Sequence, residues 1–288
     1  MISETETNYV WFSGLLPKRF PGFFHDITRA LEACGIEFGL LPHTKDIWCR
    51  DYMPVRVGRG KFVQFTYDPA YLVTKADRAT ITDPAKACKA IGIKPVISDI
   101  VLDGGNVVRH GSKVIMTRVV LASLDNAGYS REWLNAALKN LLKVDEVIFI
   151  QPERGDPFCH ADGSVRFISD KLVAIDKPHK LHPEYGASLR SVLKQHGLSW
   201  IELPYSLDDD PRHKYSAVGN YVNFLAIGKT VFVPAYKGHE AQNREAVRKL
   251  SKWFREVVPI ESTAIAKQGG VLNCISWNVF RHGGRQKK

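Results

Sequence analysis

Apolar and polar positions alternate along the chain with two different periods. Apolar residues spaced three and four apart predict amphipathic helices over residues 23–34, 83–92, 130–142, 183–196 and 240–256. Ser130 and Pro183 are start signals that favour the third and fourth of these helices. Short runs rich in valine and isoleucine separate the helices and are typical of strands. The pattern predicts an α/β fold.

Four segments share one pattern, in which a strand, a polar turn, a lysine and a second apolar strand follow each other. They are MPVRVGRGKFVQFTY, NVVRHGSKVIMT, SVRFISDKLVAID and YVNFLAIGKTVFVPAY, with their lysines at Lys61, Lys113, Lys171 and Lys229. The lysines are 52, 58 and 58 residues apart, and a helix and a further strand follow each hairpin. A fixed period of this length indicates stacked or circular repeats rather than one doubly wound sheet.

The two ends of the chain can supply a fifth repeat. We expect GGVLNCISWNVF to pair near YVWFSG, with helix 23–34 and strand 36–41 completing the unit. The prediction is a five-bladed ββαβ propeller with pseudo-five-fold symmetry, in which residues 1–288 form a single domain around one central opening. The basic stretch 281–288 is expected to be a solvated, partly disordered tail.

Polar residues recur at the start of equivalent strands. Asp51 and Asp103 each lie ten residues before a turn lysine, Asp162 and Asn220 lie nine before theirs, and His160 lies eleven before. In a ring, residues at this shared position converge on the axis. Asp and Asn are also common in ordinary turns, but the same register in four repeats favours a common site.

Composition narrows the classes of function. The 288 residues are 44% hydrophobic, which is enough for a sizeable core, and no apolar run is long enough to span a membrane. The polar N-terminus lacks a signal-peptide layout, so we expect a cytoplasmic protein without a membrane partner. The net charge of +10 is scattered and accompanies no nucleic-acid recognition motif, so no nucleic-acid partner is expected.

Short motifs combine residue types that carry chemistry. They are Trp48-Cys-Arg-Asp51-Tyr-Met-Pro54, Asp103-Gly-Gly-Asn106, His160-Ala-Asp162 and Gly269-Gly-Val-Leu-Asn-Cys274. On a strand, His160 and Asp162 would share one face. The glycine pair before Cys274 lets backbone approach a ligand closely.

The other cysteines are interpreted as packing residues. Cys34 and Cys88 lie on predicted helices, while Cys49 and Cys159 would face away from neighbouring site residues. The five cysteines form no CxxC pair, which argues against a disulfide framework and a structural zinc site. A metal bound by Cys159 and His160 is the weaker alternative, because adjacent strand residues point apart.

In this order and on this period, the motifs resemble the guanidino-group-modifying enzymes, the penteins, and within them the agmatine deiminase and bacterial peptidylarginine deiminase branch. The resemblance runs from about Asp46 to Trp277. It implies a cysteine-dependent deiminase that converts a guanidino compound, such as agmatine or an arginine derivative, to a ureido product and ammonia through a covalent thiouronium. It implies a small guanidino substrate, no cofactor and no metal, and leaves a homo-oligomer open.

The resemblance also implies a role for each matching residue. The nucleophile would be Cys274, the general acid/base His160 and its orienting partner Asp103, while Asp51 and Asp162 would grip the guanidinium and Trp48 would flank it. The family usually has glutamate where this chain has Asp103, and often histidine where it has Asn273. Dihydrolysis, amidino transfer and an inactive ring that only binds its ligand are the alternatives.

Physical chemistry favours the same roles. A guanidinium has a pKa of roughly 13 and a delocalised charge, and carboxylates can hold it in bidentate fashion. The cation of the substrate would also favour a thiolate at Cys274. His160 could then protonate the departing ammonia and later activate water.

Overall fold

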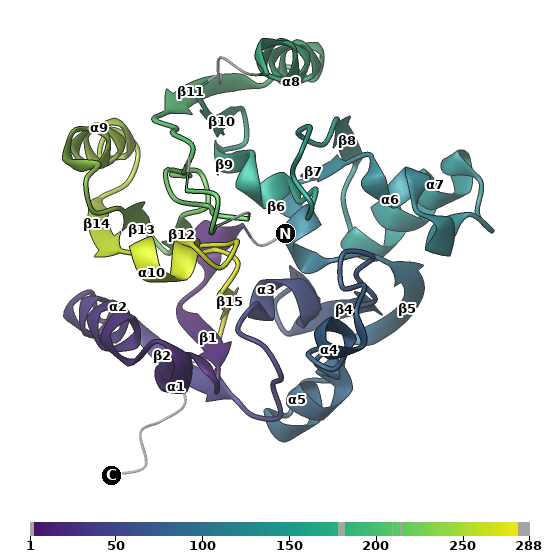
Figure 1. Cartoon of the computed structure of the whole chain (residues 1–288). Helices are drawn as coiled ribbons and strands as arrows, with labels where there is room; N and C mark the ends of the chain where they lie inside the picture. Colours follow the sequence, from purple (N-terminus) through teal and green to yellow (C-terminus); the bar gives the residue numbers. More distant parts are fainter. Residues whose placement is uncertain (1–2, 178–181, 209, 214, 282–288) are drawn as a thin grey trace.

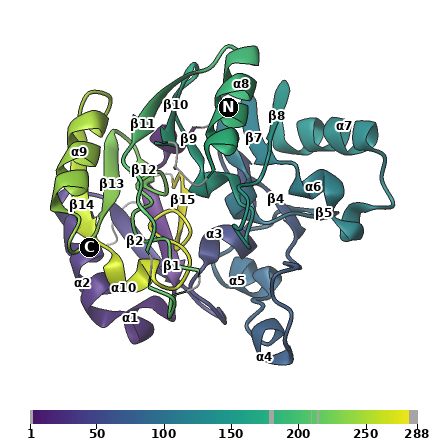
Figure 2. The ribbon, with the colours of Figure 1, turned by 45° about the horizontal axis from the view of Figure 1, so that its top comes forward.

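The structure is a computed structural model that describes residues 3–177, 182–208, 210–213 and 215–281. Within these residues, five three-stranded sheets surround a central axis (Figure 1). Helices α2 (Pro21–Ala33), α7 (Arg131–Leu142) and α9 (Glu240–Leu250) lie on the outer rim, as the turned view in Figure 2 also shows. The predicted α/β ring of five repeats is therefore confirmed.

Each internal sheet is an antiparallel hairpin whose second strand pairs in parallel with a third strand that follows a helix. The four sheets are β3–β4–β5 (Val55–Gly58, Lys61–Thr66, Val96–Val101), β6–β7–β8 (Val108–His110, Lys113–Thr117, Glu146–Ile150), β9–β10–β11 (Val165–Ser169, Leu172–Asp176, Ser199–Leu203) and β12–β13–β14 (Leu225–Ile227, Thr230–Ala235, Glu256–Glu261). Lys61 and Lys113 open the second strands of their hairpins, and Lys171 and Lys229 immediately precede theirs.

The fifth sheet joins the two ends of the chain, as the sequence predicts. Strand β1 (Tyr9–Ser13) pairs antiparallel with β15 (Ser276–Val279), and Trp11 lies opposite Trp277. On its other edge β1 pairs in parallel with β2 (Glu37–Leu41), and α2 connects the two. This sheet closes the ring.

Apolar side chains fill the space between the sheets and the outer helices. In α7 the buried residues are Leu134, Leu138 and Leu142, which share one helical face. They pack in a cluster with Val114 of β7 and Val147 of β8. Ser130 caps this helix by accepting a hydrogen bond from the backbone of Trp133, so the predicted start signal has a physical role.

The predicted helix over residues 240–256 is too long, because α9 ends at Leu250. The apolar spacing of four continues to Phe254, which is buried in the same core cluster as Leu250. Phe254 reaches that core from a turn, and the amide of Arg255 already donates to the carbonyl of Lys229. The periodicity of buried residues therefore outlasts the helix that it predicts.

The remaining elements are two helices and a set of single turns. The helices α5 (Pro84–Ala90) and α8 (Pro183–Gln195) match predicted ones. The single turns are η1 (Glu4–Glu6), α1 (Leu16–Arg19), α3 (Cys49–Tyr52), α4 (Lys75–Arg78), η2 (Gly104–Asn106), α6 (Val119–Ala122), η3 (Leu124–Asn126), η4 (Ala161–Gly163) and α10 (Thr263–Ala266). Among the described residues no helix is long and apolar enough to cross a membrane. Apart from Arg281, the predicted tail 281–288 lies outside the described residues.

Candidate active site

Two buried carboxylates face one cavity near the ring axis. Asp51 on α3 is 7% exposed and Asp162 on η4 is 2% exposed. Asp51 Oδ1 accepts a hydrogen bond from the backbone of Gly105 at 3.0 Å, and Asp162 Oδ2 accepts one from Asn273 Nδ2 at 2.5 Å. The two acids are thus held by different repeats of the ring.

The site residues lie on single helical turns, not on strands. Asp51 lies on α3 and Asp162 lies on η4. Asp103 is the residue that immediately precedes η2. The assumption that His160 and Asp162 share a strand face is wrong, because residues 161–163 form a 3₁₀ turn. Cys274 likewise lies in a turn just before β15. The shared register of the acids therefore marks the helical turn that precedes each hairpin.

The glycine pair after Asp103 lets two of these turns meet. A Cβ on Gly104 would lie 2.0 Å from the carbonyl oxygen of Arg50. A Cβ on Gly105 would lie 2.5 Å from Asp51 Oδ1 and 2.7 Å from His160 Nδ1. Only glycine can bring backbone this close to both side chains.

His160 lies between two carboxylates. Its Nε2 is 2.9 Å from Asp103 Oδ2, and its Nδ1 is 3.5 Å from Asp51 Oδ1. Burial acts to lower the pKa of His160, but the charges of Asp51 and Asp103 outweigh burial and raise it to about 10. Burial also raises the pKa of Asp51, to about 8, against the effect of His160. The empty site therefore holds protons that an incoming cation would displace.

Asn223 positions the Cys274 thiol. Its Oδ1 accepts from the backbone amides of Asn273 and Cys274 at 3.1 and 3.3 Å. Its Nδ2 lies 3.2 Å from Cys274 Sγ and 3.3 Å from the carbonyl oxygen of Asp162. One carboxamide thus fixes the turn that carries Cys274 against the turn that carries Asp162.

The Cys274 thiol is buried and has a carboxylate beside it. Cys274 Sγ lies 3.7 Å from Asp162 Oδ2, and the residue is 9% exposed. Burial raises the pKa of Cys274 well above its usual range, and the charges of Asp162 and Asp51 raise it further. Thiolate formation at Cys274 is therefore disfavoured, and a positive charge next to Asp162 would favour it.

The cavity above these residues has a volume of about 940 Å³ and is lined by Trp48, Asp51, His160, Asp162 and Cys274. Trp48 is half-buried, and its backbone amide donates to Asp46 Oδ1 at 3.0 Å. A Cβ on Gly270 would lie 2.8 Å from the Trp48 ring and 3.1 Å from Cys274 Sγ. The second glycine of the pair before Cys274 therefore leaves room for the ring and the thiol together.

The structure brings together all six residues that the sequence singles out. Asp103 lies behind His160, away from the main cavity, and despite its short side chain it reaches the ring at 2.9 Å. Asn220 also lines the cavity, but its side chain donates to the carbonyl of Gly163 at 2.7 Å.

The sequence interpretation missed Asn223 and gave no role to Asn273. The signal for Asn223 is a lone polar residue inside the apolar run YVNFLAI, where a buried amide needs partners. Cys49, expected to pack, is fully buried and donates its thiol to the carbonyl of Ile275 at 2.9 Å. Cys159 is half-buried and has a left-handed φ of 56°.

Gly105→Ala should lower catalytic efficiency about 100-fold, because displacing reacting groups by an ångström costs about this much. The new methyl group must push Asp51 or His160 from its position. Gly22→Ala is the matched control, since no atom lies within 4 Å of its added Cβ. Steady-state kinetics of both folded variants checks this, and equal activity in the two would contradict the role of Gly105.

Known proteins share this fold and sequence pattern. Residues 24–279 match the model of a family described as Porphyromonas-type peptidyl-arginine deiminase. A Streptococcus mutans protein assigned as an agmatine deiminase is 25% identical over 224 residues, which cover 66% of this chain and 60% of that protein's length.

Solved structures of other proteins have a similar fold over nearly the whole chain. The structure of a C. jejuni agmatine deiminase variant with substrate bound has a TM-score of 0.75 at 20% identity and covers 97% of this chain and 96% of its own. Agmatine deiminase of Enterococcus faecalis has a TM-score of 0.70 at 19% identity, with 97% and 95% covered. An amidinotransferase of saxitoxin biosynthesis from Microseira wollei has a TM-score of 0.65 at 14% identity, with 100% and 98% covered.

Proposed function

Because the chain belongs to the Porphyromonas-type peptidyl-arginine deiminase family, we propose that it converts the guanidino group of a small substrate to a ureido group and ammonia, with Cys274 as nucleophile. The family match and the relatives support a hydrolase that acts on C–N bonds of amidines. The observation that carries the proposal is the acid beside the thiol, with 3.7 Å between Asp162 Oδ2 and Cys274 Sγ. A buried carboxylate here opposes thiolate formation unless the substrate is a cation.

Binding begins with the two acids. Asp51 and Asp162 approach the cavity from different turns, so each can take one edge of a planar guanidinium through paired N–H···O bonds. The cation lowers the pKa of Asp51 and of the Cys274 thiol by direct charge attraction. Trp48 supplies an aromatic wall against which a guanidinium can stack.

The first chemical step forms a C–S bond. The Cys274 thiolate attacks the central carbon, and the tetrahedral adduct collapses as one C–N bond breaks. His160, protonated and held by Asp103, gives its proton to the nitrogen that leaves as ammonia. A positively charged thiouronium remains on Cys274, and the same carboxylates stabilise it.

The second step consumes water. His160, now neutral, takes a proton from water as the water oxygen attacks the thiouronium carbon. The C–S bond then breaks as the carbonyl of the ureido product forms, and the hydroxyl proton of the adduct passes to the departing sulfur, which restores the Cys274 thiol. Asp103 keeps the His160 ring in place through both transfers, so we assign it a positioning role.

We also propose that residues 1–288 form one catalytic domain that works in the cytoplasm without a cofactor. A homo-oligomer is compatible with this function.

The experiment that tests the function is a product assay over a panel of guanidino compounds, namely agmatine, arginine, an Nα-blocked arginine and a peptide with C-terminal arginine. We expect one ammonia and one ureido product per turnover for at least one compound. Two ammonia molecules with carbon dioxide would instead indicate dihydrolysis, and a product that requires an added amine would indicate amidino transfer. No turnover of any member would favour a ring that only binds its ligand.

A further inference from the structure

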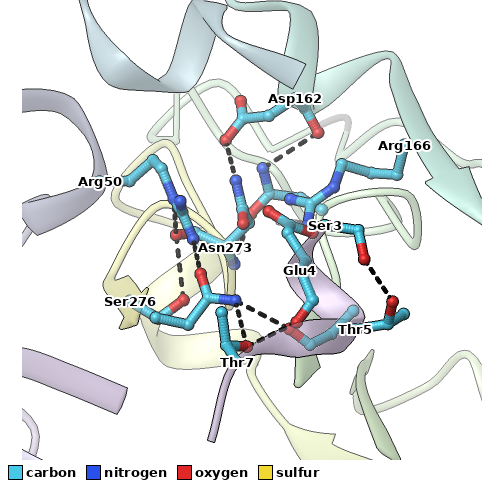
Figure 3. Close-up of polar contacts among 12 residues, drawn as sticks. Ser3, Glu4, Thr5, Thr7, Arg50, Asp162, Arg166, Asn273 and Ser276 are labelled. Carbon is cyan, nitrogen blue, oxygen red and sulfur yellow. Dashed lines mark hydrogen bonds and ion pairs between the residues drawn. The ribbon is translucent and has the colours of Figure 1, made fainter. Parts of the chain in front are cut away.

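A cluster of arginines lies around the N-terminal turn η1. Arg166 pairs with the carboxylate of Glu4 (Figure 3). Arg56 Nη2 donates to the carbonyl of Ser3 at 2.9 Å. Arg109 Nη1 donates to the carbonyl of Arg56 at 2.7 Å. Arg50 Nη2 donates to Asn278 Oδ1 at 2.7 Å. These four arginines come from three repeats of the ring, and Arg56 and Arg166 contact the first described residues of the chain.

Three of them enclose a small cavity. It has a volume of about 40 Å³ and is lined by Glu4, Arg50, Arg56, Gly104, Arg109 and Trp277, among others. This space exceeds what one water molecule needs. The cavity is separate from the large one that Cys274 lines.

Several guanidinium nitrogens here are buried without a partner. Arg56 Nη1 and both Nε and Nη2 of Arg109 make no hydrogen bond to any part of the chain that the structure describes. A buried donor without an acceptor costs about 1–3 kcal/mol, and more when it is charged. Three such donors beside one cavity call for an acceptor inside it.

The local charge points the same way. Arg50, Arg56 and Arg109 line the cavity, while the Glu4 carboxylate that also lines it is paired with Arg166. The carboxylate of Glu6 binds the backbone amide of Ser3. Burial lowers the pKa of Arg56, but only to about 10, so it stays charged at neutral pH. Four cations thus face two carboxylates in this part of the ring.

We propose that this cavity binds one small inorganic anion, a halide or an oxyanion such as phosphate. The anion accepts hydrogen bonds from Arg56 and Arg109 and offsets the excess positive charge. It thereby ties η1 to the ring, since Arg56 also holds the carbonyl of Ser3. Arg50 links this site to the nucleophile turn, because its backbone amide donates to the carbonyl of Cys274 at 3.1 Å.

The test compares anions at constant ionic strength. The full chain is exchanged into gluconate, an anion too bulky for the cavity, and chloride, bromide or phosphate then replaces gluconate in separate titrations. We expect a saturable rise in the unfolding temperature with the anion that fits, as for any ligand that binds only the folded state. The halide and phosphate arms identify which anion this is. An unfolding temperature that is the same in all these anions would overturn the proposal.

Two further measurements locate the effect. Arg109→Gln should lose the saturable rise, whereas the matched control Arg59→Gln should keep it, because Arg59 is exposed and stacks over Phe280. If Arg109→Gln does not fold, crystals of the unaltered protein with bromide or arsenate decide the matter. An anomalous peak in the cavity is expected, and a cavity without one at saturating anion would refute the site.

Discussion

Cys274→Ser should abolish turnover, with a loss of several orders of magnitude in kcat. A serine hydroxyl is far less acidic than a thiol, so substrate charge cannot ionise it at neutral pH. The substitution removes little volume, and the backbone contacts that Asn223 makes to this turn remain available. Substrate affinity should therefore change much less than turnover. Single-turnover and binding measurements on the variant separate the two effects.

The charge requirement at Cys274 gives a sharper form of this prediction. A cationic haloacetamidine should alkylate Cys274 much faster than a neutral haloacetamide of the same size, because only the cation offsets Asp162 and Asp51. Cys34→Ala should leave that rate unchanged, since Cys34 lies at the end of α2. An adduct on Cys159 or Cys34 in place of Cys274, seen by mass spectrometry, would contradict the assignment.

Asp51→Asn and Asp162→Asn should each cost about 2–5 kcal/mol of transition-state stabilisation, as when one partner of a buried charge pair is removed. Each variant keeps the shape of the side chain and loses the charge that the guanidinium needs. Asp77→Asn is the matched control, because Asp77 lines the same cavity but is only half-buried. Its effect on kcat/KM should stay below about tenfold, as for charges that solvent screens. Near wild-type efficiency in both Asp51→Asn and Asp162→Asn would sink the guanidinium clamp.

The stability of Asp51→Asn distinguishes lost charge from lost fold. Burial raises the pKa of Asp51 from 3.8 to about 8, so between these values the folded protein keeps a proton that the unfolded chain has released. Stability of the wild type must then fall as pH rises through this window. Asparagine removes that titration. The unfolding temperature of Asp51→Asn relative to that of the wild type should therefore rise from about pH 4 to about pH 8.

The repeat pattern predicted the fold well because each repeat contains its own local signals for a turn, a helix and strands. Each hairpin carries its own lysine turn, and each long helix has its own start signal or apolar face. Where two elements share one apolar spacing, local sequence fails, as at Phe254 beyond the end of α9. That boundary is set by the pairing of β14 with β13, which the spacing does not encode.

The candidate site also has a part that local sequence predicts and a part that it does not. The acids and His160 share a register in the repeats, which predicted that they converge, whereas Cys274 was assigned from the glycine pair before it and from the family resemblance. The turns that carry them are shaped by contacts between repeats, such as the approach of Gly105 to Asp51. Asn223 is 51 residues from Cys274 and belongs to another sheet, so only the folded ring reveals the contact.

The pairing of β1 with β15 has a consequence for how the enzyme is made. Trp11 meets Trp277 across that pair, so the ring cannot close until both strands have left the ribosome. The clamp acids and His160 emerge long before Cys274, which is the last of the set in sequence. A nascent or truncated chain that lacks β15 cannot form the contacts of Asn223 that hold the Cys274 thiol in place. The edge of β1 that β15 would cover is then open and can pair with wrong partners. Catalytic competence should thus appear abruptly with the final strand, as the slow step of a fold rich in distant contacts.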